Sequence, residues 1–192
     1  MKKHLFSTAM CLTSILLANS VLAKGHSEKH ISNQEFEFVQ RDAVTVDRSS
    51  SFQLNMPPSK ALPLFTAPGE ILWAPDWRPN ILSGDGFEKG TIWLTKHANN
   101  TTYWHVSEYD TSNNVALYTL VTPGISMGTV GVVVSKSGDN GSLVSVTYNL
   151  TGLSDAGNKK LLTLYSKEHY PKMIAQWKDW IEANIDKIHS HY

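Results

Sequence analysis

Four residues of the sequence have side chains that could move a proton to or from a bound molecule: Glu70, His105, Tyr118 and Tyr148. A carboxyl, imidazole or phenol group acts as a general acid or base when its pKa is tuned towards the working pH. Each residue also has a structural interpretation. Glu70 falls in the first turn of a short predicted helix, where the helix dipole stabilises a carboxylate. His105 falls on the outer side of a predicted strand. Tyr118 and Tyr148 alternate with apolar neighbours, as core tyrosines do. The sequence therefore assigns no catalytic residue.

The segment GISMG, from Gly124 to Gly128, has the G-x-S-x-G spelling of a hydrolase nucleophile elbow. In that elbow a strand precedes the serine and a helix follows it. Here the β-branched run TVGVVV follows Ser126, so we expect a turn that enters a strand. The sequence also has no H-E-x-x-H, no cysteine pair and no Gly-rich phosphate loop that opens a helix. It therefore indicates neither a metal site nor a cofactor.

Large aromatic side chains suggest a different chemistry, the binding of an apolar molecule. The segment LFTAPGEILWAPDWRPN, from Leu64 to Asn80, contains Trp73, Trp77 and three prolines. Pro75 and Pro79 lack a backbone donor and disfavour helix at the residue before them, which excludes one long helix or a central strand. We expect a short helical turn and then an ordered loop. Because loops run over the surface, the two tryptophans should lean on something apolar.

Residues 1–23 have the pattern of a secretory signal peptide. Two lysines precede the apolar run from Leu5 to Leu17, and a small-residue cleavage site ends at Ala23. The run is shorter than the roughly 20 apolar residues that usually span a bilayer. We therefore expect cleavage after Ala23, a periplasmic or secreted protein, and no stable insertion into a membrane.

The composition fits one folded domain with little affinity for nucleic acid. The chain has 17 basic and 17 acidic side chains, a formal net charge of zero, and no cluster of Lys and Arg. A nucleic-acid-binding surface is normally basic, so this class of partner is disfavoured. We expect residues 24–35 to form a flexible polar tail and residues 36–192 to form a single domain, since this length suits one hydrophobic core.

Five segments in close succession have the composition of strands, and turn residues separate most of them. They are Gly90–His97, Thr101–Asp110, Asn114–Val121, Ser126–Lys136 and Ser142–Thr151. The connections TSNN, TPG and SGDNG favour antiparallel hairpins, so the segments predict a meander. An earlier strand is expected from Phe36 to Leu54, and two short helical pieces follow it.

Alternation along the strands predicts which side chains face the core. In the last strand Val144, Val146, Tyr148 and Leu150 alternate with polar residues and should point inward. In the predicted strand Thr101–Asp110 the alternation is less clear, and it places Trp104 and Val106 inward. It leaves four residues on the outer side: Tyr103, His105, Ser107 and Tyr109.

The C-terminal segment has apolar residues at steps of three and four, which predicts an amphipathic helix of roughly 18–20 residues. They are Tyr170, Met173, Ile174, Trp177, Ile181, Ile185 and Ile188, with Lys172, Gln176, Asp179, Glu182 and Asp186 on the other side. Such a helix must bury its apolar face, and the inward face of the meander is the only large partner. The predicted fold is α+β, a helix-grip fold in which a curved antiparallel sheet wraps around a long C-terminal helix.

The sequence resembles bacterial members of the SRPBCC superfamily, which includes START lipid-transfer domains, the birch-pollen-allergen type and polyketide cyclases. The similar segments are LFTAPGEILWAPDWRP, YWHVSEYD and VSVTYNLTGLSDAGN, and the resemblance extends from about Phe36 to Ile188. It implies a cavity for an apolar ligand between the sheet and the long helix, with the tryptophan-rich loop near its mouth. The candidate ligand-binding residues are Glu70, Trp73, Trp77, Trp104, Tyr118, Tyr148 and Trp177.

Three functions remain open at this point. A cavity rich in aromatics and without an assembled acid, base or metal set favours an exported binding protein for a lipid-like or other apolar small molecule. The alternative is a cyclase- or hydrolase-like enzyme that uses Glu70, His105 or a tyrosine, at least two of which would have to meet in the cavity. A protein-interaction module would instead have a filled core.

Overall fold

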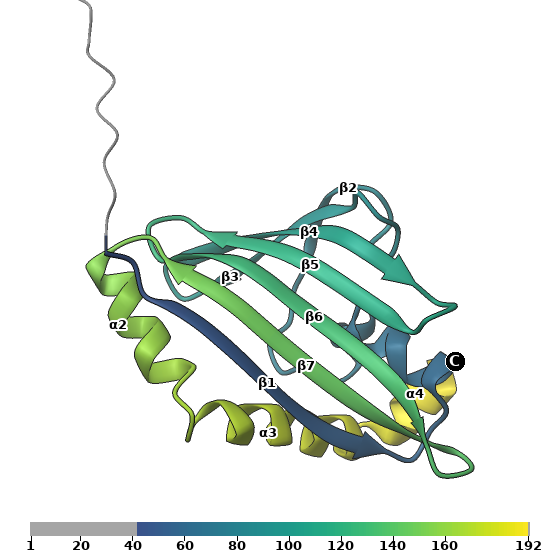
Figure 1. The fold of residues 1–192 in the computed structure, drawn as a ribbon. Coiled ribbons are helices and arrows are strands. Elements are labelled where there is room, and N and C mark those ends of the chain that lie inside the picture. The colour runs from purple at the N-terminus through teal and green to yellow at the C-terminus, as the bar shows by residue number, and fades with distance from the viewer. Residues whose placement is uncertain (1–41, 192) are drawn as a thin grey trace, which may run out of the picture. The chain divides into compact units, whose positions relative to one another are not determined.

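Seven antiparallel strands form one sheet in the computed structural model, which describes residues 42–191 (Figure 1). The strands are β1 (Thr45–Leu54), β2 (Asn80–Ser83), β3 (Ile92–His97), β4 (Asn100–Asp110), β5 (Val115–Thr122), β6 (Ser126–Ser137) and β7 (Gly141–Gly152). Their spatial order is β1-β7-β6-β5-β4-β3-β2. The predicted meander from β3 to β7 is confirmed, and the first strand pairs with the last. Residues 1–41, which include the expected signal peptide, the tail and the start of the first strand, lie outside the described part.

Helices occupy two places in the chain. Between β1 and β2 lie α1 (Pro58–Ala61) and the 3-10 helices η1 (Leu62–Phe65) and η2 (Gly69–Leu72), as expected for short pieces after the first strand. After β7 come α2 (Asp155–Leu164), α3 (Tyr170–Ala183) and α4 (Ile185–His191). Figure 1 shows α2 and α3 following one another beside β1, and the two helices contact β7 and β1 respectively. No helix between residues 42 and 191 is both long and apolar enough to cross a membrane.

The core lies between the inner face of the sheet and these helices. All four residues of β7 expected to face inward are buried, as are Tyr170, Ile174, Ile181 and Ile188 on the C-terminal helices. Met173, Trp177 and Ile185 are partly exposed and pack against the same core. The polar side of the helical period is exposed, so the amphipathic pattern identified the buried face correctly.

The long C-terminal helix is interrupted, which differs from the expectation of one continuous helix. α3 ends at Ala183, and Asn184 leaves the helical region with φ −111° and ψ 17°. The Asn184 side chain donates to the carbonyl of Trp180 at 2.9 Å. Asparagine side chains compete in this way with backbone hydrogen bonds, and the chain restarts as α4 at Ile185.

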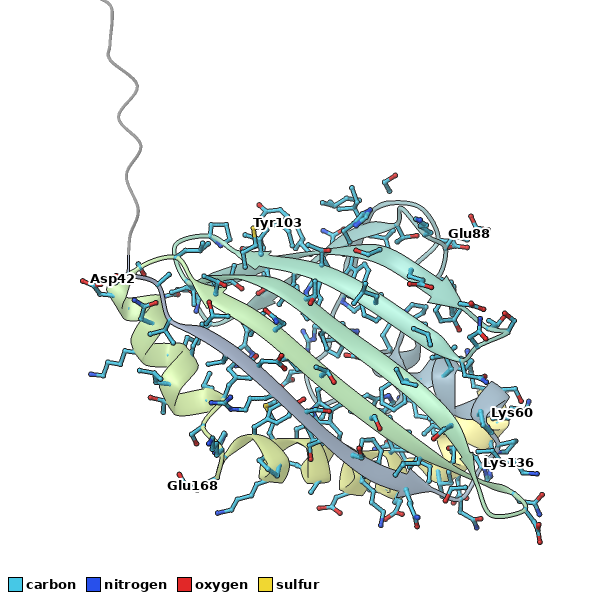
Figure 2. The ribbon with its side chains drawn as sticks, viewed as in Figure 1. Asp42, Lys60, Glu88, Tyr103, Lys136 and Glu168 are labelled. Atoms are coloured by element: carbon cyan, nitrogen blue, oxygen red, sulfur yellow. The ribbon has the colours of Figure 1, made fainter. Side chains whose placement is uncertain are left out.

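Tyr109 faces the inside of the sheet, so its expected outer position is wrong. A β-bulge shifts the register of β4 against β5 between Val106 and Glu108. Beyond the bulge Tyr109 pairs with the fully buried Ala116 and packs against the core. One extra residue reverses the alternation from that point on. Before the bulge the prediction holds, and Tyr103 lies at the surface, 41% exposed (Figure 2).

The elements α2 and β2 were not predicted from the sequence. α2 begins after Ser154, whose hydroxyl accepts a hydrogen bond from the amide of Gly157 at 3.0 Å. This is an N-cap, followed by Asp155 in the first turn, so the signal was present in the sequence. β2 has four residues, all exposed, and offers no alternation that could have revealed it.

A candidate ligand-binding cavity

A cavity of about 420 Å³ opens between the inner face of the sheet and the helices. All six tryptophans of the chain line it: Trp73, Trp77, Trp93, Trp104, Trp177 and Trp180. The strands β5, β6 and β7 supply aliphatic and tyrosine side chains, while α2 and α3 supply the opposite wall. Four lining residues are exposed and mark the mouth: Pro75, His97, Lys160 and Leu164.

The aromatic walls are packed against one another in two groups. In the first, Trp93 stacks on Trp104 with ring centroids 5.8 Å apart, and Trp77 meets Trp104 edge to face at 5.8 Å. In the second, Trp73 and Trp177 lie 5.7 Å apart and both contact Phe65. Aromatic pairs at these separations favour each other beyond the area they bury, so the walls are formed before any ligand arrives.

The loop after η2 is anchored through its two tryptophans. The indole N–H of Trp73 donates to the carbonyl of Leu64 at 2.7 Å, and that of Trp77 donates to the carbonyl of Ala67 at 2.8 Å. Trp73 is only 3% exposed, so it belongs to the inner wall and not to the mouth, where the resemblance had implied both residues would lie. Trp77 is half-buried and leans on Trp104.

The backbone around Glu70 is fixed on both sides. The Glu70 amide donates to the carbonyl of Thr66 at 2.9 Å, and the Glu70 carbonyl accepts from the amides of Trp73 and Ala74. Residue 69 must be glycine, because a Cβ there would collide with the carbonyl oxygen of Pro63. The turn Gly69–Leu72 is therefore held tightly against η1, and it aims Glu70 at the cavity.

The Glu70 carboxyl group, in contrast, has no hydrogen-bonding or ionic partner among residues 42–191. Burial among aromatic side chains raises its pKa from the ordinary 4.5 to about 8. Some of its surface remains accessible because it faces the cavity. Glu70 lies in the first turn of a short helix, as expected, but η2 has a single turn, and desolvation is the cause that raises the pKa of Glu70.

Two cavity tyrosines lie close enough to Glu70 for its charge to affect them. Tyr118 donates its hydroxyl to the carbonyl of Phe65 at 2.9 Å, whereas Tyr148 packs against Tyr165 with ring centroids 5.3 Å apart. Burial raises the pKa of both the Tyr118 and Tyr148 hydroxyls, and a Glu70 carboxylate would raise them further. Both phenols are therefore neutral in the physiological range.

The structure brings all seven sequence-derived candidate residues to the wall of this one cavity. His105 does not join them, because it lies on the outer side of β4, 3.4 Å from the Ser107 hydroxyl. Ser126 lines the cavity as the first residue of β6, and a strand follows it, so the expected turn entering a strand is confirmed.

Two tryptophans of the cavity were not among the candidates. Trp93 pairs directly with Trp104 across β3 and β4, which the strand register would have revealed. Trp180 lies three residues after Trp177 on the same side of α3.

A curved antiparallel sheet, helices on its inner face and an aromatic cavity between them define a protein of the helix-grip fold. Solved structures share this fold. Norcoclaurine synthase from Thalictrum flavum matches with a TM-score of 0.54 and 13% identity over 73% of this chain and 94% of its own. Ginseng major latex-like protein 151 from Panax ginseng has a TM-score of 0.55 and 14% identity over 72% of this chain and 96% of its own. Ara h 8.0201 has a TM-score of 0.52 and 16% identity over 78% of this chain and 99% of its own.

These neighbours share the helix-grip fold, so the fold that the sequence resemblance implied is confirmed. No family model and no curated protein matches the sequence.

Proposed function

We propose that this protein is an exported binding protein that holds an apolar small molecule, lipid-like or aromatic, in the cavity between sheet and helices. The observation that carries the proposal is the gathering of every tryptophan of the chain around one cavity. A stable core does not require this, since large aromatic residues can fill several separate places in a fold. Export rests on the signal-peptide pattern of residues 1–23.

The size of the cavity agrees with a small molecule. Its volume of about 420 Å³ falls within the roughly 300–1,000 Å³ that is usual for ligand sites. One structure of norcoclaurine synthase from Thalictrum flavum, which has the same fold, is a complex with dopamine and hydroxybenzaldehyde. A helix-grip fold can therefore hold small aromatic molecules, which supports a similar occupant here.

Native mass spectrometry of the protein, purified from the compartment to which it is exported, tests the proposal. We expect an additional mass that disappears in denaturing conditions, and saturable calorimetric binding of an apolar probe such as a naphthalene derivative. Trp104→Ala should weaken that binding, whereas Ile92→Ala, a change at an exposed residue of β3, should not. Absence of saturable binding by fatty-acid and naphthalene probes alike would contradict the proposal.

A second candidate function is general acid and base catalysis in the same cavity. It is favoured by the meeting there of Glu70, whose pKa of about 8 is close to the working pH, with the neutral phenols of Tyr118 and Tyr148. Of these, Tyr118 has already committed its proton to Phe65, which leaves Glu70 and Tyr148 as the pair. If a captured ligand is chemically altered by the wild type and bound unaltered by Glu70→Gln, the protein is an enzyme.

A further inference from the structure

Among residues 42–191, Glu70 supplies the single carboxyl group of the cavity wall. It reaches the wall from a turn whose backbone is hydrogen-bonded to Thr66, Trp73 and Ala74, so its position is fixed. Its oxygens accept no hydrogen bond from the described residues, although a carboxyl placed among aromatic rings is costly unless it is paired. The turn therefore holds a strong acceptor in the cavity and leaves it free for something that is not part of the protein.

The basic groups of the cavity are not that partner. Lys160 on α2 and His97 at the end of β3 are the lining residues that can carry positive charge, and both are exposed at the mouth. Neither forms an ion pair with Glu70. The described part of the chain therefore offers no partner for this carboxyl group, and a ligand can bring one.

The other walls of the cavity suit a cation. The faces of tryptophan and tyrosine rings carry negative electrostatic potential and attract ammonium groups, most strongly when water is excluded. Six tryptophans and the tyrosines Tyr118, Tyr148 and Tyr165 line this cavity. A carboxylate ligand would instead meet ring faces that repel it and, above the Glu70 pKa of about 8, a second negative charge.

Building on the proposed binding function, we infer that the ligand is an organic cation: an apolar, aromatic-sized body with one protonated amine or quaternary ammonium group that lies against Glu70 inside the tryptophan walls. The two parts of the site then have separate tasks. The rings bind the body of the ligand by burying its apolar surface and by stacking on it. Glu70 selects the positive charge through a charge-assisted contact.

This pairing makes binding depend on pH in a defined direction. In the empty cavity Glu70 has a pKa of about 8, so it is neutral at pH 7. A bound cation favours the carboxylate and lowers that pKa, so binding near neutral pH releases a proton. The affinity for a cation should rise with pH up to about 8 and then level off.

The groups that face Glu70 do not reverse this sign. Tyr118 on β5, Tyr148 on β7 and Tyr165 after α2 have raised pKa values and stay neutral, that of Tyr165 at about 12. Lys160 and His97 lie at the mouth. The lining residues of β4, β6 and α3 have no side chain that titrates near neutral pH.

Calorimetric titration with three probes of one shape tests the inference. The probes are naphthylethylamine, which is a cation, naphthylethanol, which is neutral, and naphthylacetate, which is an anion. At about pH 8.5 we expect the wild-type protein to prefer the amine over the alcohol about tenfold or more, and the anion to bind weakest. Near pH 6 the preference should shrink, and titrations in buffers of different ionisation enthalpy should show proton release on amine binding.

Glu70→Gln should lose both the preference for the amine and its pH dependence. It should still bind naphthylethanol as the wild type does, which would show that the cavity is intact. Glu88→Gln, which removes an exposed carboxylate before β3, is the matched control and should behave like the wild type (Figure 2).

Two results would overturn the inference while leaving the binding function in place: equal affinities of the wild type for amine and alcohol above pH 8, or an amine preference that survives Glu70→Gln. Failure of all three probes to bind would overturn the binding function itself, and the inference with it.

Discussion

Trp93 and Trp104 lie directly opposite each other on β3 and β4, and their rings stack with planes only 2° apart. The pair forms one continuous wall, and the Trp77 ring stands on Trp104 at 70°. The loop that carries Trp77 therefore rests on a surface provided by two neighbouring strands near the β2 edge of the sheet. Trp73, four residues earlier, is instead enclosed by Phe65 and Trp177.

This difference in position predicts different effects of truncation at the two loop tryptophans. Trp77→Ala should weaken binding of a naphthalene probe by about 1–3 kcal/mol and lower stability less than that, because a half-buried ring gives only part of its area to the core. Trp73→Ala should cost about 3–5 kcal/mol of stability. Urea unfolding and calorimetry on both variants measure the two quantities. A large stability loss with unchanged affinity for Trp77→Ala would place that residue in the core.

The inward face of α3 gives a second prediction. Trp177→Asp should destabilise the protein by several kcal/mol, because it places a charge against Phe65 and Trp73. Gln176→Asp, one residue earlier and exposed, should change stability by less than about 1 kcal/mol. The urea midpoints of the two variants measure their stabilities. Equal losses of stability would be incompatible with Trp177 on the inward face of α3 and Gln176 on its outer face.

Glu70 predicts how stability depends on pH. Its pKa is raised from 4.5 in the unfolded chain to about 8 in the folded one, so the folded protein binds the proton more tightly. The stability that this proton contributes is complete below pH 4.5, falls as pH rises from 4.5 to 8, and does not change further above 8. The total is of the order of a few kcal/mol.

Glu70→Gln removes the loss of stability between pH 4.5 and 8, since the glutamine amide does not ionise in this range. The variant should match the wild type near pH 4 and be more stable by roughly 2–5 kcal/mol near pH 9. Other titrating groups, such as Asp110 with its pKa lowered to about 2 by hydrogen bonds from Ser112 and Asn113, are common to both proteins and cancel in the difference. If the urea midpoints of the wild type and Glu70→Gln change with pH in parallel, the raised pKa of Glu70 in the folded protein is contradicted.

Gly69 gives a test of how the Glu70 turn is held. Gly69→Ala should destabilise the protein by several kcal/mol, because the new methyl group collides with the Pro63 carbonyl that belongs to the preceding turn. Gly131→Ala on β6 is the control, since its methyl group would meet only Leu117 at an ordinary distance of 3.8 Å. We expect that control to be neutral or slightly stabilising. Similar stabilities for the two variants would show that the turn can move away from η1.

Export is tested by N-terminal sequencing. The two lysines, the apolar run and the site at Ala23 predict a mature chain that begins at Lys24 and is recovered from the periplasm or the medium. Exported protein that retains Met1 would contradict the prediction. Replacing Leu16 and Leu17 by Asp should retain the protein in the cytoplasm, because it interrupts the apolar run.

The parts of the fold that follow a regular period could be predicted from the sequence. The buried sides of β7 and of the C-terminal helices are defined by uninterrupted alternation and by steps of three and four, and both predictions are confirmed. The failures occur where a single residue breaks the period. The bulge after Val106 turned Tyr109 inward, and the Asn184 side chain divided the last helix, neither of which a periodic pattern can show.

The candidate site was predicted for a different reason. Aromatic residues on the inward faces of the strands and of the C-terminal helix must meet in a fold that has one core, so naming these residues required only the face and not the distances. Trp73 and Trp77 were assigned to the cavity through the family resemblance. Their partner across the sheet, Trp93, was missed because it depends on the pairing of β3 with β4. The chemical character of Glu70 was also out of reach, because it arises from the rings around the carboxyl group and not from the sequence near residue 70.

The placement of all six tryptophans on one cavity gives the protein a built-in optical signal. Because no indole lies elsewhere in the chain, the tryptophan fluorescence, excited selectively, comes only from residues of the cavity wall, and a change in its wavelength or intensity on adding a molecule reports on that wall. The stacked rings of Trp93 and Trp104 should in addition couple their electronic transitions and produce a paired positive and negative band in circular dichroism. A library of compounds can thus be screened against the unlabelled protein, with the dichroic band reporting whether an occupant separates the two rings.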